Sequence, residues 1–302
     1  MKPLISIVLA SYNGEKYLRP QLDSLLAQDY PSLEFVCVDD ASSDESWAIL
    51  QAYQAKDPRL TILQQSANHG YIATFEKGIR AATGDLIALA DQDDIWVPNK
   101  ISKLFDALGQ ASLVYSDSEL IDARGEKMGQ KMSQIKKQIA YDSPLMYTFG
   151  AWAPGHSMLF KRDILDTALP FSNYVTHDYL LGFAATCHEG IHYLPIPLVQ
   201  YRQHETNAIG ADLKKSKKTY KSRQERNHRI CERVKILADR CPDSAEKKIF
   251  ERLYRHFSGS SLFDRIQRVA LVFKHRHTML AYKGKSVFGN FVYPFKLMLG
   301  IY

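Results

Sequence analysis

The sequence predicts an α/β protein built on an open, mostly parallel sheet with helices on both faces. Two observations favour this fold class. Four short apolar runs with the length of buried strands alternate with three helical patterns over the first 91 residues. Each apolar run ends in a loop of polar or acidic residues. No apolar stretch of roughly 18 residues is present, so no segment is expected to span a bilayer.

The expected elements alternate regularly along this part of the chain. The apolar runs predict strands at residues 4–10, 33–38, 60–63 and 86–90. Between them, apolar residues at helical spacing predict helices over residues 17–26, 47–53 and 72–82. Because such crossovers are right-handed, the strands should lie parallel, with their carboxyl ends at one edge of the sheet. Ligands of open α/β sheets bind outside that edge.

The loops expected at this edge are all polar. They are Ser11-Tyr12-Asn13, Asp39-Asp40, Asn68-His69-Gly70 and Asp91-Gln92-Asp93-Asp94. Neither a Gly-x-Gly-x-x-Gly loop nor a P-loop lysine follows the first strand, so another group would have to hold the phosphates of a nucleotide. A metal ion on the last loop would serve, because hard cations take oxygen ligands. Asp39 and Asp40 could then accept hydrogen bonds from the base or ribose, while the Tyr12 ring packs against the base.

The acidic loop has two interpretations. Three carboxylates among four residues at the end of a buried strand cost stability unless a positive charge compensates them. A divalent cation with a phosphorylated ligand would be that compensation. Alternatively, Asp94 caps the helix that begins near Pro98, and Asp91 and Asp93 are solvated beside it.

Two further candidates lie in the less regular second half. The elements expected there are strands at residues 112–116, 156–160 and 191–194 and a polar excursion at 122–144. Asp178 opens an apolar helix, where it is either an N-terminal charge favoured by the helix dipole or a general base at a cleft. His204 is either a metal ligand or an ordinary loop histidine.

Taken together, these motifs resemble the family 2 glycosyltransferases of the GT-A fold, which is Rossmann-like, over about residues 3–210. Residues 6–14 are similar to the family's opening strand and nucleotide loop, residues 38–44 to its base-binding segment, and residues 68–85 to the segment before its metal motif. Asp91-Gln92-Asp93-Asp94-Ile95-Trp96 with Tyr201-Arg202-Gln203-His204-x-x-Asn207 further resembles bacterial rhamnosyltransferases that build cell-wall, capsular or O-antigen polysaccharides.

The resemblance implies a donor site at the strand ends. Ala10, Tyr12 and Asp40 would contact the nucleotide base, and Asp91 the ribose or the donor sugar. The same loops would supply the remaining donor contacts, from Ser11, Asn13, Asp39, Asn68, Gly70 and Gln92.

The resemblance also implies a metal site and a catalytic base. Asp93 would ligate Mn²⁺ or Mg²⁺ together with the donor diphosphate, with Asp91 beside it and His204 completing the shell. Asp94 stays open as an alternative to Asp93. Asp178 would be the base.

The implied reaction is an inverting transfer without a covalent enzyme intermediate. A dication neutralises the nucleoside-diphosphate leaving group, while a carboxylate on the opposite face of the sugar takes the proton of the attacking hydroxyl. The Gln-x-x-Arg-Trp signature of processive synthases is absent, so one sugar per encounter is expected. The donor expected from the narrower resemblance is dTDP-L-rhamnose, and the acceptor is a glycan or a lipid-linked saccharide.

Alternatives remain for the donor and for the class of protein. The donor sugar could instead be UDP-linked GlcNAc, Gal or Glc. A sugar-phosphate nucleotidyltransferase is a hypothesis of another class, although the Gly-rich loop and lysine it needs after the first strand are missing. A catalytically silent sugar-nucleotide-binding protein is the third hypothesis.

Charge sets the C-terminal third apart. Residues 1–202 contain 17 Lys and Arg against 24 Asp and Glu, a net charge of −7, whereas residues 203–302 contain 22 against 9, a net charge of +13. The expected division is a catalytic domain at 1–210, with a nucleotide-sugar half at about 1–117 and an acceptor half at about 118–210. A basic, amphipathic helical region at 211–302 follows.

Two interpretations stay open for the region 211–302, in which 214–229 is strongly basic and 287–302 is apolar and aromatic. It is either a solvated helical cap or a peripheral contact with the inner face of the cell membrane. Nucleic acid is not expected, because no binding motif is present. The four cysteines lack metal-site spacing, which favours reduced thiols and a cytoplasmic location. The oligomeric state is not indicated.

Overall fold

The computed structural model describes residues 2–204, 223–283, 289 and 291–295. The strands are β1 (Ile5–Ser11), β2 (Leu33–Asp39), β3 (Leu60–Gln64), β4 (Leu86–Asp91), β5 (Ile95–Trp96), β6 (Leu113–Ile121), β7 (Lys127–Lys131), β8 (Met158–Lys161) and β9 (Ile191–Arg202). The α-helices are α1 (Glu15–Leu26), α2 (Ser46–Gln54), α3 (Tyr71–Ala81), α4 (Lys100–Leu108), α5 (Met132–Ile135), α6 (Leu165–Ala168), α7 (His177–Thr186), α8 (Arg223–Arg240), α9 (Ala245–Ser258), α10 (Leu262–Lys274) and α11 (Arg276–Met279). The 3₁₀ helices are Pro144–Tyr147, Gly155–Ser157, Arg162–Ile164 and Ala281–Lys283.

These strands form one sheet in the order β3-β2-β1-β4-β8-β6-β9-β5, with β7 paired to β6. The strands β1 to β4 are mutually parallel, which places Ser11 beside Asp39 and Ala10 beside Asp91. The predicted meeting of polar loops at one edge is therefore confirmed, and so is the α/β fold class. The second half is mixed, because β8 runs antiparallel to both β4 and β6, whereas β6 and β9 are parallel.

Apolar residues on the two faces of the sheet belong to two separate cores. Along β1, Ile5, Ile7 and Leu9 pack in the core that includes residues of α1, α2 and α4. Val8, between them, packs in the core that includes residues of α3 and α7. This alternation follows from the period of two along a strand, and it explains why the strands of the parallel half read as continuous apolar runs.

The strand β9 is much longer than expected from the sequence, which predicted only residues 191–194. It continues to Arg202 through Pro195 and Pro197, two residues that cannot donate to a ladder. The pairing with β6 shifts register around Asp117, which lies opposite Pro197. Because a bulge leaves a position unpaired, it lets the strand pass through the prolines. The final residues of β9 pair with the short strand β5, which the sequence did not predict.

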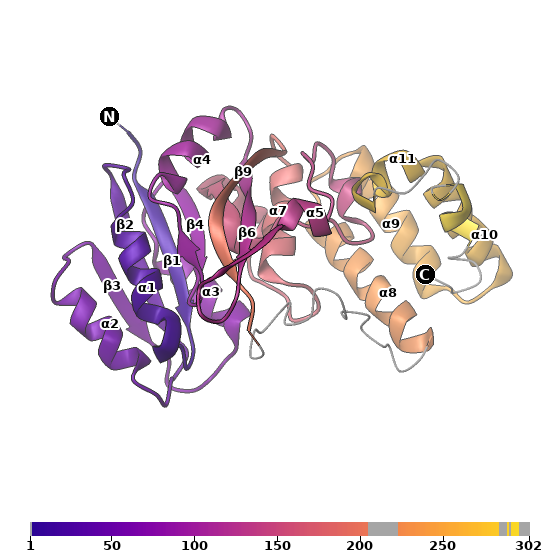
Figure 1. Ribbon diagram of the computed structural model, residues 1–302. Coiled ribbons are helices and arrows are strands. Elements are labelled where there is room, and N and C mark those ends of the chain that lie inside the picture. The colour runs from indigo at the N-terminus through magenta and orange to yellow at the C-terminus, as the bar shows by residue number, and fades with distance from the viewer. Residues whose placement is uncertain (1, 205–222, 284–288, 290, 296–302) are drawn as a thin grey trace.

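The predicted C-terminal helical extension is present and packs on the rest of the chain. Val234 and Leu237 of α8 and Phe250 of α9 belong to the same core as α7. The rings of Phe183 and Phe250 meet edge to face at a centroid distance of 5.9 Å. The Arg240 guanidinium donates to the carbonyl oxygen of Thr167 at 3.2 Å. In Figure 1 the helices α8 to α11 lie at the opposite end of the molecule from α2 and β3.

Some sequence expectations lie outside the described residues. They concern residues 214–222, most of the apolar stretch 287–302, and Asn207. Among the helices that the structure describes, none has both the length and the apolar character needed to cross a membrane.

We expect Phe250→Ala to destabilise the whole chain. The side chain is fully buried between α7 and α9, and truncating a buried Phe costs about 3–5 kcal/mol. Thermal or urea unfolding should show one transition at lower stability. The matched control is Phe263→Ala, whose side chain is exposed on α10 and whose replacement should change stability by less than about 0.5 kcal/mol. Equal effects of the two substitutions would contradict this packing.

Candidate active site

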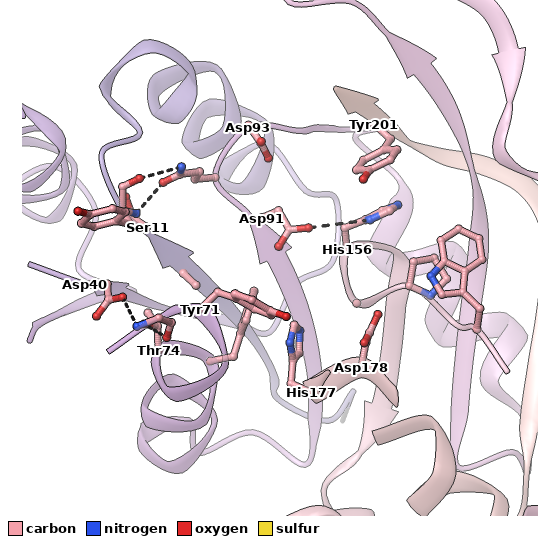
Figure 2. A pocket seen from close by; sticks show the side chains of 18 of the residues that line it. Ser11, Asp40, Tyr71, Thr74, Asp91, Asp93, His156, His177, Asp178 and Tyr201 are labelled. Carbon is pink, nitrogen blue, oxygen red and sulfur yellow. Dashed lines mark hydrogen bonds and ion pairs between the residues drawn. The ribbon is translucent and has the colours of Figure 1, made fainter. Parts of the chain in front are cut away.

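A cavity of about 400 Å³ opens at the carboxyl edge of the sheet and joins the two halves of the fold. Most of the predicted site residues line it, namely Ala10, Ser11, Tyr12, Asp40, Asn68, Gly70, Asp91, Gln92, Asp93 and Asp178. Figure 2 shows Asp40 at one end, with Asp91 and His156 near the middle and Asp178 beyond them. Asn13 and His204 instead line an adjoining hollow, which shares Tyr12, Gln92 and Asp93 with the cavity.

Asp39 and Asp40 take different positions although they are neighbours in sequence. The Asp39 carboxylate is buried behind the loop, where it accepts hydrogen bonds from the Ser42 N–H at 3.0 Å and from Gln64 at 3.3 Å. Asp40 faces the cavity and accepts from the backbone N–H groups of His69 and Gly70, both at 2.8 Å. Asp40 therefore joins the loop after β2 to the loop before α3.

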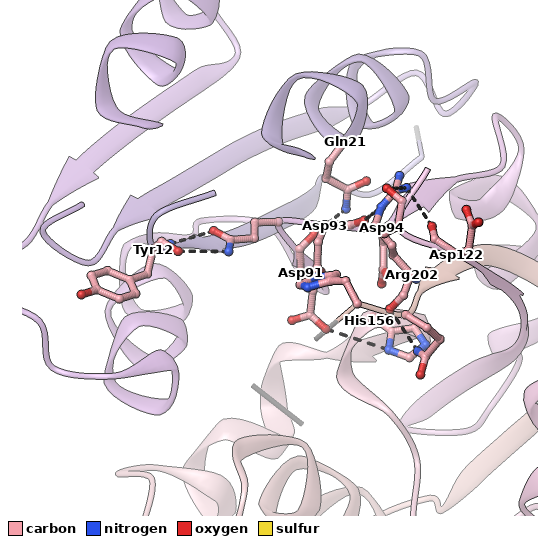
Figure 3. Close-up of polar contacts among 12 residues, drawn as sticks. Tyr12, Gln21, Asp91, Asp93, Asp94, Asp122, His156 and Arg202 are labelled. Atoms are coloured by element: carbon pink, nitrogen blue, oxygen red, sulfur yellow. Dashed lines mark hydrogen bonds and ion pairs between the residues drawn. The ribbon is translucent and has the colours of Figure 1, made fainter. Parts of the chain in front are cut away.

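The Gln92 side chain lies between the cavity and the adjoining hollow and lines both. Its Oε1 accepts from the Tyr12 N–H at 2.8 Å, and its Nε2 donates to the Tyr12 carbonyl at 3.1 Å (Figure 3). A Cβ at Gly14 would overlap this amide, so the glycine there leaves room for the Gln92 side chain in this position. Both polar ends of Gln92 are thus used to hold the backbone of Tyr12.

The acidic loop ends β4 with carboxylates that repel one another. Burial, and then the charges of Asp93 and Asp178, raise the pKa of Asp91 to about 7. Asp94 is fully buried, and burial, followed by the charges of Asp93 and Asp91, raises its pKa well above the usual value. Asp94 Oδ1 accepts from the Arg202 N–H at 3.0 Å, whereas its Oδ2 has no hydrogen-bond partner among the described residues.

The interpretation of Asp94 as a helix cap is wrong. Its carboxylate bonds to β9, the strand β5 intervenes, and α4 begins only at Lys100, after Asn99. Pairing of β5 with β9 turns the chain away before the helix starts, so Asp94 is too early in the sequence to reach the N–H groups of α4.

Lys100 lies under the acidic loop and was not singled out from the sequence. It is fully buried, its Nζ donates to the His156 carbonyl at 2.6 Å, and it sits 3.1 Å from the centroid of the Trp96 ring. Burial lowers the pKa of this amino group, although the Asp94 and Asp91 carboxylates oppose that shift. Lys100 therefore offsets the acidic charge only in part.

His156 is the second residue that the sequence did not indicate, since it was placed at the start of an apolar strand. Its ring stacks on Tyr201 at 4.4 Å, its Nε2 lies 2.9 Å from Ser118 Oγ, and its Nδ1 lies 4.0 Å from Asp91 Oδ2. Burial, followed by the charge of Lys100, lowers the pKa of His156 to about 3, so the ring is neutral at physiological pH.

Two sets of potential metal ligands adjoin each other. Donor atoms of Asp91, Asp94 and His156 lie within 4.8 Å of one another. Asp93, the residue expected to bind metal, instead has its Oδ2 2.7 Å from Nε2 of His204. The unsatisfied Asp94 oxygen, the raised carboxyl pKa values and a neutral imidazole all fit a divalent cation in the first set.

Asp178 lies in the first turn of α7, as expected of an N-terminal helix charge, and it also faces the cavity, as expected of a general base. Its position is compatible with both predictions. Its Oδ1 accepts from the Tyr179 N–H at 2.8 Å and from the Thr176 hydroxyl. No hydrogen bond to its Oδ2 is found among the described residues, which leaves that oxygen available to a ligand. Gly155 lets its own backbone lie close to the start of α7, because a Cβ there would be only 3.0 Å from His177 Nε2.

Comparison with solved structures identifies the fold. S. aureus TarS, crystallised with UDP-GlcNAc, is 18% identical and has a TM-score of 0.64, over 99% of this chain and 88% of that one. The mannosyltransferase PcManGT of Pyrobaculum calidifontis, in complex with GDP-Man and Mn²⁺, is 17% identical with a TM-score of 0.55, over 100% of this chain and 81% of that one. The fold is that of the GT-A glycosyltransferases.

The family follows from the sequence comparison. The model "Glycosyl transferase family 2" matches residues 6–168, more than half of the chain, and the chain therefore belongs to this family. As the resemblance of its motifs implied, it is a glycosyltransferase.

Two curated relatives illustrate the range of similarity. The uncharacterized glycosyltransferase RP339 of Rickettsia prowazekii is 30% identical over 70% of this chain and 67% of its own length. The dTDP-rhamnosyl transferase RfbG of Shigella flexneri is 27% identical over 68% of this chain and 74% of its own length. The chain spans between 53% and 67% of the length of the first few curated relatives.

The raised pKa of Asp91 predicts that the metal-free protein loses stability as the pH rises. An unfolded Asp titrates near pH ~3.9, whereas the folded pKa is about 7. Between these values the native state keeps a proton that the unfolded state has lost, so the free energy of unfolding falls with pH. Melting temperature measured in EDTA from about pH 5 to 8 should decline, and Asp91→Asn should flatten the profile. A wild-type profile no steeper than that of the variant would contradict the prediction.

Proposed function

We propose that this chain is an inverting, metal-dependent glycosyltransferase that moves one sugar per encounter from a nucleoside diphosphate to an acceptor hydroxyl. The observation that carries the proposal is the placement of Asp178 and the acidic loop on one cavity. A free carboxylate oxygen of Asp178 and the acidic loop then face the same space from opposite halves of the fold. The chain would divide as expected from its motifs, with donor residues before about 117, acceptor residues at about 118–210, and a helical region from 211.

The nucleotide is proposed to bind at the Asp40 end of the cavity. Tyr12 is 45% exposed there, so its ring is available to stack on a base. A carboxylate offers about four acceptor positions, and Asp40 already accepts from the N–H groups of His69 and Gly70 and from Gln65 Nε2 at 2.6 Å, so one position is left for a base or ribose. Ala10, Ser11 and Asn68 line the same end, with Gly70, whereas Asn13 adjoins it from the neighbouring hollow. Asp39 would act indirectly, by shaping the loop.

Mn²⁺ or Mg²⁺ is the proposed cofactor. When bound, the cation would stabilise the negative charge of the departing nucleoside diphosphate. Asp91, Asp94 and His156 would hold it, and Asp93 with His204 would lie at its side toward the hollow. This assignment modifies the expectation from the sequence, in which Asp93, Asp91 and His204 were the ligands.

Asp178 is the proposed catalytic base. Its Oδ1 is held by Thr176 and by the Tyr179 N–H, so Oδ2 would accept the proton from the acceptor hydroxyl as that oxygen attacks the anomeric carbon. The bond to the diphosphate oxygen breaks as the new glycosidic bond forms. Attack from the side opposite to the leaving group inverts the anomeric centre.

The proposed donor is dTDP-L-rhamnose, and the acceptor is a glycan or lipid-linked saccharide of a bacterial surface polysaccharide. The named activity of RfbG supports this donor. UDP-linked GlcNAc, Gal or Glc are the alternatives, and TarS was crystallised with UDP-GlcNAc. A panel of nucleotide sugars with Mn²⁺, screened by thermal shift, separates these donors because the one that binds tightest raises the melting temperature most.

Asp178→Asn should lower kcat by about 10²–10⁴-fold while nucleotide affinity stays near the wild-type value, because the substitution removes only the proton acceptor. EDTA should abolish transfer by the wild type, and Mn²⁺ should restore it. The measurement is release of nucleoside diphosphate, with the anomeric configuration of the product determined by NMR.

The matched control for this experiment is Asp163→Asn, an exposed carboxylate outside the cavity, which should transfer at the wild-type rate. Full activity of Asp178→Asn would contradict the assignment of Asp178 as the base. Full activity in EDTA would contradict the proposed metal dependence. Release of pyrophosphate would identify a nucleotidyltransferase instead.

Gln92→Leu should weaken nucleoside-diphosphate binding by roughly tenfold. Two hydrogen bonds to the Tyr12 backbone are lost, at about 0.5–1.5 kcal/mol each, so the base-stacking ring is no longer held in place. Isothermal titration with dTDP and UDP in Mn²⁺ measures the effect. Gln51→Leu, on the exposed side of α2, is the control, and equal affinities of the two variants would show that Gln92 does not position the loop.

A further inference from the structure

An exposed apolar surface extends along α10 to residues 291–295. We call it the α10 face; its members are Leu262, Phe263, Ile266, Phe273, Phe291 and Phe295. Apart from Phe273, these side chains are between 43% and 68% exposed. Leu262, Ile266 and Phe273 are spaced by four and seven residues, so they share one side of the helix. The Phe273 ring lies 5.4 Å from that of Phe291 and 6.1 Å from that of Phe295, which makes the surface continuous.

The opposite side of α10 is firmly anchored. Leu271 and Val272 are buried in the core, and the buried Arg268 guanidinium lies 5.1 Å over the Phe257 ring. A capping box fixes the start of the helix, where Ser261 Oγ accepts from the Asp264 N–H at 3.1 Å. The α10 face is therefore held outward by the packing of the helix, and it takes no part in the protein core.

Positive charge surrounds the α10 face. Residues 262–283 contain five Arg and Lys against one Asp, and without Arg268, which is buried on the anchored side, the net charge is +3. The acid, Asp264, is committed to the cap and lies 3.0 Å from His256. Arg265 and Lys274 are exposed on α10, and the Arg276 guanidinium lies 4.3 Å over the Phe273 ring. A cation thus stands directly beside an aromatic ring of the α10 face.

We infer that the α10 face binds the surface of an anionic phospholipid bilayer. Its Leu, Ile and Phe side chains would enter the boundary between headgroups and acyl chains, and Arg265, Lys274 and Arg276 would pair with lipid phosphates. Apolar anchors combined with basic residues are the features that hold helices in the plane of an interface. A second copy of this chain fits less well, because a symmetric contact would bring two positively charged surfaces together.

The proposed contact is separate from the catalytic chemistry. Among the described residues, those lining the cavity belong to the first 201 positions, and α10 contributes none of them. Figure 1 places α10 at the end of the molecule opposite β3. Membrane binding can therefore be tested apart from the identity of the donor, the acceptor and the base.

The experiment is flotation of the full chain with vesicles of phosphatidylcholine, with and without phosphatidylglycerol, at low and high salt. Wild type should float with the anionic vesicles and lose most of this binding in high salt. The double substitution Phe263→Ser with Ile266→Ser should lower the apparent affinity about tenfold or more. The matched control is Met128→Ser, whose exposed apolar side chain lies on β7, outside the face, and it should bind like the wild type.

Melting temperature and sugar transfer to a soluble acceptor should be the same for the wild type and both variants, which separates lipid binding from folding and from the proposed activity. Wild-type affinity of the double variant would overturn the inference. Equal binding to neutral and anionic vesicles would also overturn it, because charge complementarity is part of the argument. A wild-type dimer in sedimentation that the double variant abolishes would assign the α10 face to a second copy instead.

Discussion

Repulsion between neighbouring carboxylates is the constraint on which the site depends. Asp94 is fully buried at the end of a strand with apolar cores on both sides, so little water reaches it to screen its charge. Asp91, whose side chain is 41% exposed, lines the cavity beside it. The Lys100 amino group relieves this only in part, because burial also disfavours its own charged form. The loop therefore favours any further positive charge that reaches it. Stability is lower in its absence, as is common where a site is built for a ligand rather than for the fold.

The strand β9 makes this arrangement possible. Its last residue, Arg202, donates its backbone N–H to Asp94 and its Nε to the Asp93 carbonyl at 2.7 Å. Its neighbour Tyr201 supports the His156 ring. A strand from the second half of the fold thus holds the acidic loop of the first half, and the register shifts opposite Pro197 let it reach that far. The two halves are coupled through backbone contacts at the site itself.

The sequence predicted the parallel half of the sheet and its polar edge well, because both follow from local patterns. Apolar runs and helical spacing are properties of neighbouring residues, and parallel crossovers bring the loops together without further information. His156 and Lys100 escaped prediction for the opposite reason. A histidine in an apolar run and a lysine at a helix start acquire their roles only when distant segments enclose them. The short strand β5 and the burial of Asp39 likewise depend on tertiary partners that no local pattern encodes.

The helix α7 lies between the cavity and the C-terminal helices. Asp178 stands at its start, the Arg233 guanidinium of α8 lies 5.2 Å over the Tyr179 ring, and Phe183 meets Phe250. The helix that carries the proposed base thus packs on one side against residues far along the chain. A fragment that ended near residue 204 would contain every acidic group of the site, but the side of α7 that packs on the C-terminal helices would be exposed to water. The position of Asp178 therefore depends on a core that residues of α8 and α9 complete.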